Sequence, residues 1–121
     1  MGRTAIVVVD MQNAYASKGG MLDLGTGIDE ARIRPVIEAN KKLLGAARTV
    51  GVKIVYLQFG YKPDLSDAGG PQSPNVRKQM AFKLIKERPE VRDKLIIEGT
   101  WGWQIIDELA NASGLVLAKL N

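Results

Sequence analysis

Apolar runs alternate with polar, glycine-rich stretches along the chain, and the spacing of the apolar residues switches between strand-like and helix-like. A continuous apolar run from Thr4 to Val9, ending at Asp10, is typical of a strand buried on both faces. Similar runs cover Val52–Gln58 and Leu115–Ala118. These three runs predict the main strands of a parallel sheet, and Leu95–Glu98 is a candidate for a short edge strand.

Between the first two strands, apolar residues recur at helical spacing from about Ile28 to Gly51. Pro35 is expected to begin this helix or to lie in its first turn, because a proline deeper inside would remove a hydrogen bond and clash with the preceding turn. Two further helices are predicted. One is a basic helix over Asn75–Lys86, and the other covers Trp101–Ala110 with Thr100 as its cap.

Two stretches rich in glycine and small polar residues, 11–27 and 60–74, are predicted to be long loops. Each follows a predicted strand, which is where α/β proteins usually keep their functional groups. The order strand, helix, strand makes a βαβ unit, whose crossover should be right-handed. We therefore expect an α/β fold in which residues 1–121 belong to a single domain.

The composition is that of an ordinary globular protein, with 45% hydrophobic and 25% charged residues. The net charge of +4 comes from 17 basic and 13 acidic residues, which are spread along the chain apart from a denser stretch at 77–94. This distribution favours a solvated helix face over a nucleic-acid surface. No apolar run approaches the roughly 20 residues that cross a bilayer. We expect a cytoplasmic protein with no nucleic-acid or membrane partner.

The chain contains neither cysteine nor histidine. Disulfides, thiolate metal sites, cysteine nucleophiles and imidazole bases are therefore excluded within these residues. Neither a GxGxxG pattern nor a Walker lysine motif is present, so nucleotide binding has no support. We predict no metal and no cofactor.

Asp10 and Lys119 lie at or near the carboxyl ends of predicted strands. Ligands of open parallel sheets bind beyond these ends, so the two residues are candidates for one site. A partly desolvated Asp can act as a general base, and a nearby Lys can stabilise a developing anion. The competing interpretation is that Asp10 caps a turn and Lys119 is a solvated charge.

The segment Ile6–Gly20 (IVVVDMQNAYASKGG) resembles the opening of the isochorismatase-like cysteine hydrolases, in which a strand ends in Asp followed by Met-Gln. Similarity to one branch of that family, the ureidoacrylate amidohydrolases, continues through Gly19–Leu24 (GGMLDL), Ala68–Asn75 (AGGPQSPN), Lys94–Leu109 and Val116–Lys119 (VLAK). This resemblance implies the N-terminal half of a three-layer α/β/α domain built on a parallel sheet, truncated after its third main strand.

The resemblance also implies an amidohydrolase that cleaves a carbamoyl or ureido C–N bond with an Asp–Lys–Cys triad. Asp10 would be the base and Lys119 the lysine, whereas the family's Cys follows a fourth strand, and this chain alone is expected to be inactive. In that family the fourth strand pairs with the first, so the first strand should be an open edge here. The alternative is a non-catalytic half-domain that binds or assembles with a full-length relative. A homo-oligomer, dimer or tetramer, is expected where the domain is complete.

The small-molecule substrate would meet residues close to Asp10. Phe59 and Tyr61 stand where the ureidoacrylate enzymes typically have Asn and Trp, and a Phe cannot hydrogen-bond a ureido group as an Asn can. Gln12 and Asn13 either orient the substrate or make ordinary loop hydrogen bonds.

The last candidates for substrate binding are two tryptophans. Trp101, with Trp103 beside it, is suited to stacking on a planar substrate, although aromatic residues on a short amphipathic helix more often fill the core. Trp101 is retained as a substrate-binding candidate.

Overall fold

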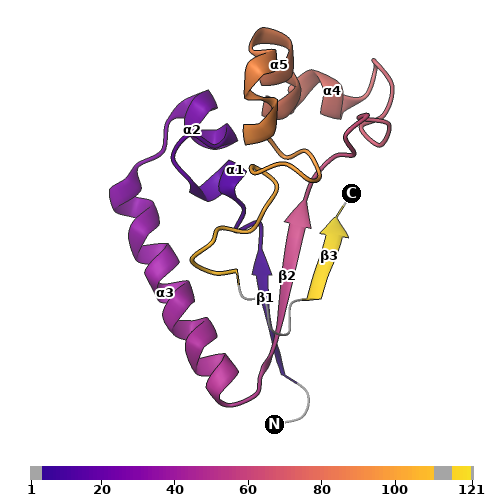
Figure 1. Ribbon diagram of the computed structural model, residues 1–121. Coiled ribbons are helices and arrows are strands. Elements are labelled where there is room, and N and C mark those ends of the chain that lie inside the picture. The colour runs from indigo at the N-terminus through magenta and orange to yellow at the C-terminus, as the bar shows by residue number, and fades with distance from the viewer. Residues whose placement is uncertain (1–3, 111–115, 121) are drawn as a thin grey trace.

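The computed structural model describes residues 4–110 and the backbone course of residues 116–120. Its strands, β1 (Ala5–Val9), β2 (Lys53–Phe59) and β3 (Val116–Leu120), form one parallel sheet in the order β1-β2-β3 (Figure 1). The predicted α/β class and parallel sheet are confirmed. Within the described part of the chain β1 is an open edge, as expected from the resemblance.

A long helix, α3 (Glu30–Thr49), connects β1 to β2, as predicted. Its N-terminus is capped by Asp29, whose side chain accepts a hydrogen bond from the amide of Ala31. Pro35 is the sixth residue of α3, so the expectation that it lies in the first turn was wrong. The amide missing at Pro35 would have bonded to the carbonyl of Ala31, and both residues are exposed, so water can satisfy that carbonyl.

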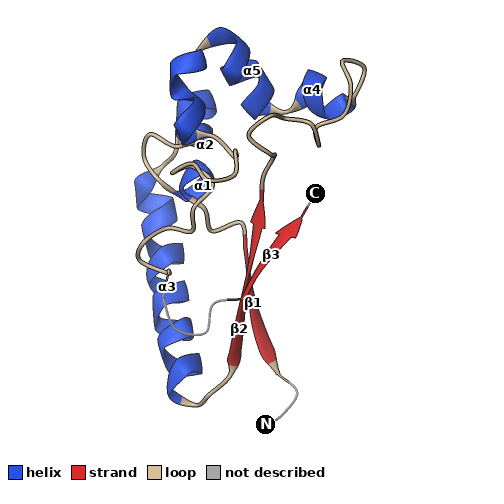
Figure 2. Cartoon of the chain, turned by 45° about the vertical axis from the view of Figure 1, so that its right-hand side comes forward, coloured by secondary structure: helices blue, strands red, loops and turns tan. Residues whose placement is uncertain are grey.

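The first of two cores lies between α3 and the sheet. Tyr56 and Val8 from the strands pack with Ile37 and Leu44 from α3, and Ile105, Ile106 and Leu109 complete this cluster. The other face of the sheet is different, because Val7 and Val9 are 52% and 51% exposed. Figure 2 shows α3 along one face, and no helix of the described part of the chain covers the other.

The second core lies beyond the carboxyl ends of the strands, where the shorter helices gather (Figure 1). These helices are α1 (Asn13–Ala16), α2 (Met21–Thr26), α4 (Pro74–Lys78), α5 (Met80–Glu87) and the 3-10 helix η1 (Pro89–Lys94). Two expectations needed correction. The predicted loop 11–27 contains α1 and α2, and the predicted helix at 75–86 is divided by the extended backbone of Gln79.

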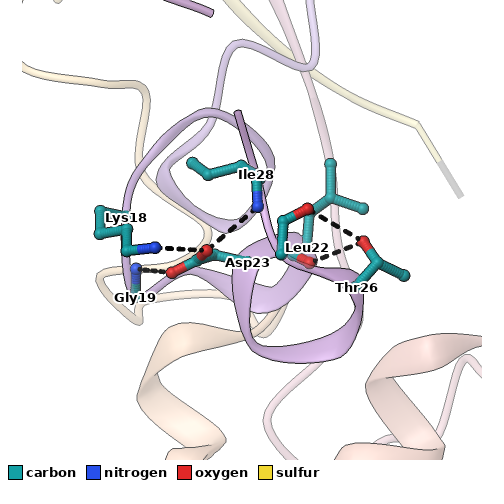
Figure 3. A network of polar contacts seen from close by, with 7 residues as sticks. Lys18, Gly19, Leu22, Asp23, Thr26 and Ile28 are labelled. Carbon is teal, nitrogen blue, oxygen red and sulfur yellow. Dashed lines mark hydrogen bonds and ion pairs between the residues drawn. The ribbon is translucent and has the colours of Figure 1, made fainter. Parts of the chain in front are cut away.

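Asp23 organises the stretch that contains α2 (Figure 3). Its carboxylate accepts hydrogen bonds from the amides of Gly19 (2.8 Å) and Ile28 (3.1 Å) and from the ammonium of Lys18 (3.1 Å). Gly19 and Gly27 have φ values of +78° and +77°, which glycine adopts readily. The glycines therefore let the chain turn around one carboxylate.

Residues 95–110 do not form the predicted edge strand or the predicted helix. Their backbone groups pair instead with the segment that follows β1. The amide of Asn13 bonds to Gln104 O (2.8 Å), that of Ala14 to Gly102 O (2.8 Å), and that of Ile106 to Met11 O (3.0 Å). These long-range bonds replace the local bonds of a helix.

Gly102 lies where this segment packs most tightly against residues 94 and 95. A Cβ at this position would collide with the carbonyl of Leu95, so the chain packs against itself more closely than any other residue allows. The expected cap residue, Thr100, donates its hydroxyl to the carbonyls of Ile97 (2.6 Å) and Leu95 (3.2 Å) instead. Two residues keep a strand-like pairing, each as a single bridge: Ile97 with Tyr61, and Ile105 with Gln12.

Candidate active site

Asp10 follows β1 directly and has an unusual backbone. Its amide still bonds to Leu57 O at 3.0 Å, but its φ is +55°, in the left-handed region that Asp and Asn adopt more readily than most residues other than glycine. Its Oδ1 is buried and has no hydrogen-bond partner in the described part of the chain. Burial raises the pKa of Asp10, an effect that the nearby amide of Phe59 partly offsets. These are the properties of a carboxylate suited to accept a proton.

Strand register places Lys119 in the same row as Asp10. Val9 pairs with Leu57 and Gln58 pairs with Lys119, so Asp10, Gln58 and Lys119 occupy equivalent positions at the ends of three adjacent strands. Neighbouring strands lie about 4.8 Å apart, which puts the backbones of residues 10 and 119 roughly 10 Å apart. The Lys119 side chain lies outside the described residues, and its catalytic role stays a prediction.

Gln12 is fully buried, and its amide is occupied by the main chain. Its Oε1 accepts from the amide of Phe59 (2.9 Å), while its Nε2 donates to Phe59 O (2.9 Å) and Trp103 O (2.7 Å). Gln12 thereby joins the end of β2 to residue 103. To bind substrate it would have to give up these bonds, so the geometry favours the loop-bonding interpretation.

Asn13 has a similar arrangement. Its Nδ2 donates to Trp101 O at 3.0 Å, and its Oδ1 accepts from the hydroxyl of Ser17 at 2.8 Å. Both polar candidates after Asp10 therefore hold the segment 101–104 in place.

Phe59 and Tyr61 stand beside each other at the end of β2. Their rings meet edge to face with centroids 5.4 Å apart, and Tyr61 makes a second such contact with Phe82 at 5.0 Å. The Tyr61 hydroxyl is buried without a partner in the described part of the chain. Burial, with a smaller effect from the charge of Asp67, raises its pKa.

The two tryptophans occupy different environments. The ring of Trp101 lies under the ammonium of Lys94, 4.8 Å from the ring centroid, and no described contact joins it to Asp10. The indole of Trp103 lies against Gly60, the residue that follows β2. Trp103, which our sequence analysis had not retained, is therefore the indole that stands next to the carboxyl end of the sheet.

Tyr15 is a second residue that sequence reasoning missed. Burial raises the pKa of its phenol well above the usual range, and the charges of Asp10 and Tyr61 raise it further. Tyr15 therefore lies in the electrostatic field of the candidate base. Tyr15 belongs to the short helix α1, which fell inside a predicted loop.

The described residues contain no group of three or more His, Cys, Asp or Glu side chains that could hold a metal ion. A cavity of about 570 Å³ lies at the start of α3, between Lys18, Arg34 and Glu108, and Asp10 does not line it. None of the described helices is both long and apolar enough to cross a membrane.

Comparison with known proteins now adds to this geometry. The family described as "Isochorismatase domain" matches residues 4–120. Ureidoacrylate amidohydrolase RutB of Cronobacter turicensis is 48% identical over 97% of this chain and 50% of its own length. The same enzyme of Rhizobium rhizogenes is 47% identical over 94% of this chain and 46% of its own. The chain thus spans about half the length of the curated relatives it matches.

Solved structures show the same fold at lower identity. A cysteine hydrolase from Pseudomonas syringae pv. phaseolicola has a TM-score of 0.60 and 24% identity over 98% of this chain and 46% of its own. An N-carbamoylsarcosine amidase from Thermoplasma acidophilum has a TM-score of 0.54 and 20% identity over 96% and 50%. Together with the sequence match over residues 4–120, these likenesses show that the chain belongs to the isochorismatase family.

Proposed function

We propose that this chain supplies the base and the lysine of an amidohydrolase that cleaves a carbamoyl or ureido C–N bond, with a ureidoacrylate-like substrate. The observation that carries the proposal is Asp10. One oxygen of its carboxylate, Oδ1, is buried without a partner in the described part of the chain, and burial raises the pKa of Asp10 although the amide of Phe59 partly offsets the rise. It stands at the carboxyl end of a parallel sheet in a chain that is 48% identical to a ureidoacrylate amidohydrolase.

In the proposed reaction a cysteine thiolate attacks the carbonyl carbon of the amide or ureido group, the C–N bond breaks, and the nitrogen leaves with the proton that Asp10 took from the thiol. Water then cleaves the thioester and restores the thiol. Asp10 moves the proton, and Lys119 stabilises negative charge at the same strand ends. The chain has no Cys, so the thiol must come from residues beyond 1–121 or from another chain.

The test is to join this chain to the second half of the Cronobacter turicensis enzyme, as a fusion and as two co-expressed chains, and to measure hydrolysis of ureidoacrylate. We expect turnover only when both halves are present. Asp10→Asn and Lys119→Met should abolish most of it. Glu38→Gln, on the exposed surface of α3, is the matched control. Turnover that survives Asp10→Asn would contradict the proposal.

A second candidate function rests on the open side of the sheet. β1 is an edge strand in the described part of the chain, and the exposed Val7 and Val9 leave an apolar face that invites a partner. A non-catalytic half-domain would use this edge to bind a full-length relative. Light scattering on mixtures with the Cronobacter turicensis enzyme tests this, and a stoichiometric complex that Val7→Lys disrupts would favour it.

The remaining expectations are carried as part of the proposal. They are a cytoplasmic location, a small-molecule substrate without nucleic-acid or membrane partners, and a dimer or tetramer where the domain is complete.

A further inference from the structure

Four buried polar atoms without partners in the described part of the chain belong to residues at, or packed beside, the carboxyl ends of β1 and β2. We call the set Asp10, Gln58, Tyr61 and Trp103 the rim. Asp10 Oδ1 and Gln58 Oε1 are acceptors, Trp103 Nε1 is a donor, and the Tyr61 hydroxyl can be either. Each such atom costs about 1–3 kcal/mol when buried unpaired, and native proteins keep few of them. This end of the sheet therefore offers unpaired donors and acceptors to a polar ligand.

Hydrogen bonds to its main-chain carbonyl hold Trp103 in place. Its carbonyl accepts two hydrogen bonds, from Gln12 Nε2 at 2.7 Å and from Gln58 Nε2 at 2.8 Å. Both donors belong to buried glutamines, so residue 103 has little freedom to move. Two buried amides are thus used to position one tryptophan.

The indole ring is positioned as closely as the backbone. A Cβ on Gly60 would lie 2.5 Å from Trp103 Cδ1 and 2.7 Å from Nε1, so the pyrrole edge of the ring occupies the space that any larger residue at 60 would fill. Gly60 follows Phe59, whose amide lies near the Asp10 carboxylate and is bound by Gln12. The indole N–H and the Asp10 carboxylate therefore flank the same turn at the end of β2.

We propose that the indole N–H of Trp103 recognises the substrate by donating a hydrogen bond to the carbonyl oxygen of its carbamoyl or ureido group. Gly60 leaves the space that the indole ring needs. A ureido group carries one carbonyl acceptor and N–H donors on both sides. The rim offers the complement, one indole donor with the acceptors of Asp10 and Gln58 nearby. This inference rests on the proposed function, and it names Trp103 as a residue that sets specificity.

The test uses the intact chain and needs no turnover. The chain has two tryptophans, so a ¹⁵N-labelled sample gives two indole N–H signals, which Trp101→Phe assigns. N-carbamoyl-β-alanine is titrated as the ureido probe, and β-alanine, which lacks the ureido group, is the control ligand. We expect a saturable downfield shift of the Trp103 indole proton with the probe alone, while the Trp101 signal stays in place.

Variants separate recognition from folding. Trp103→Phe should weaken probe binding at least about tenfold, and Gly60→Ala should do the same by displacing the indole. Gly45→Ala is the control, because a Cβ there meets nothing within 4 Å. Loss of Trp103 without loss of probe affinity would overturn this inference and leave the proposed hydrolysis standing, since that is tested by turnover and Asp10→Asn. Absence of any saturable indole shift at millimolar probe would also overturn it.

Discussion

The rim and the Asp23 loop (residues 18–28) are both built around an aspartate in the stretch that follows β1, yet the two carboxylates are in opposite states. Asp23 accepts three hydrogen bonds, and its pKa is lowered chiefly by the amide of Gly19, with help from Lys18. Asp10 Oδ1 accepts none from the described residues, and burial raises its pKa. The comparison teaches that hydrogen bonding and burial, and not residue type or loop position, set the direction in which each carboxylate's pKa moves.

The largest effect is expected for Asp10→Asn in the enzyme completed with a second half from a relative. Loss of the base should lower kcat/KM by about 10²- to 10⁴-fold. Stability should change in the opposite direction. The pKa of Asp10 is raised in the folded state, so its protonated form adds to the free energy of unfolding. This contribution is fully present below the ordinary pKa of 3.8 and is lost as pH rises through the folded-state pKa.

At neutral pH the Asp10→Asn chain should therefore be at least as stable as the parent, because Asn also tolerates a positive φ. Thermal unfolding across pH 3–8 checks this. A clear loss of stability at pH 7 would show that Asp10 is a structural residue after all.

Gln12 lies beside the rim, and its side-chain amide is fully hydrogen-bonded. Gln12→Ala removes three hydrogen bonds of a buried side chain and leaves the amide of Phe59 without its Gln12 acceptor, while the carbonyl of Trp103 keeps its bond from Gln58. We expect a loss of roughly 2–4 kcal/mol in the free energy of unfolding. Urea denaturation measures it. A loss under about 1 kcal/mol would show that water replaces the Gln12 side-chain amide and that its hydrogen bond to the Trp103 carbonyl holds this residue only weakly.

Asp23→Asn tests the other carboxylate, and we expect a smaller loss of stability than for Gln12→Ala. The lowered pKa means that Asp23 stabilises the fold above its ordinary pKa of 3.8 and loses this contribution as pH falls through the folded value. The difference between parent and variant should thus be constant near neutral pH and shrink below about pH 4. Urea titrations at several pH values measure it, and a difference that grows in acid would contradict the assignment.

The smallest effect is expected for Tyr61→Phe. Its hydroxyl is buried without a partner in the described residues, so removing it leaves the ring contacts with Phe59 and Phe82 and costs no hydrogen bond within them. Stability should stay within about 0.5 kcal/mol of the parent or rise. A loss above 1 kcal/mol in urea denaturation would show that the hydroxyl is satisfied in the folded chain and does not belong with the unsatisfied rim.

Much of the fold could be predicted from periodicity. The strands and α3 were found because their apolar spacing is regular over many residues, and Asp10 was found because it ends such a strand. The segment 101–110 was misread as a helix because its apolar spacing suits one. Its backbone groups bond instead to Met11, Asn13 and Ala14, and no local pattern reports such long-range pairing.

The site shows the same limit. Trp101 and Trp103 are separated by one residue, and composition cannot say which indole faces the sheet end. Trp103 takes this place because Gln12 and Gln58 both donate hydrogen bonds to its carbonyl and because Gly60 leaves space for its ring. Tyr15 was missed because the segment that contains it was predicted to be a loop, whereas it forms α1.

The sequence by itself determined the α/β class, the parallel strands, the long helix and the carboxylate at the end of β1, because each follows from local spacing and from the chemistry of single residues. Only the tertiary structure decided which polar groups are satisfied. Hydrogen bonding and burial depend on what residues distant in the chain bring to the same place. For this reason both polar atoms of the Gln12 side chain are paired, whereas Asp10 Oδ1, two residues earlier, has no partner among the described residues.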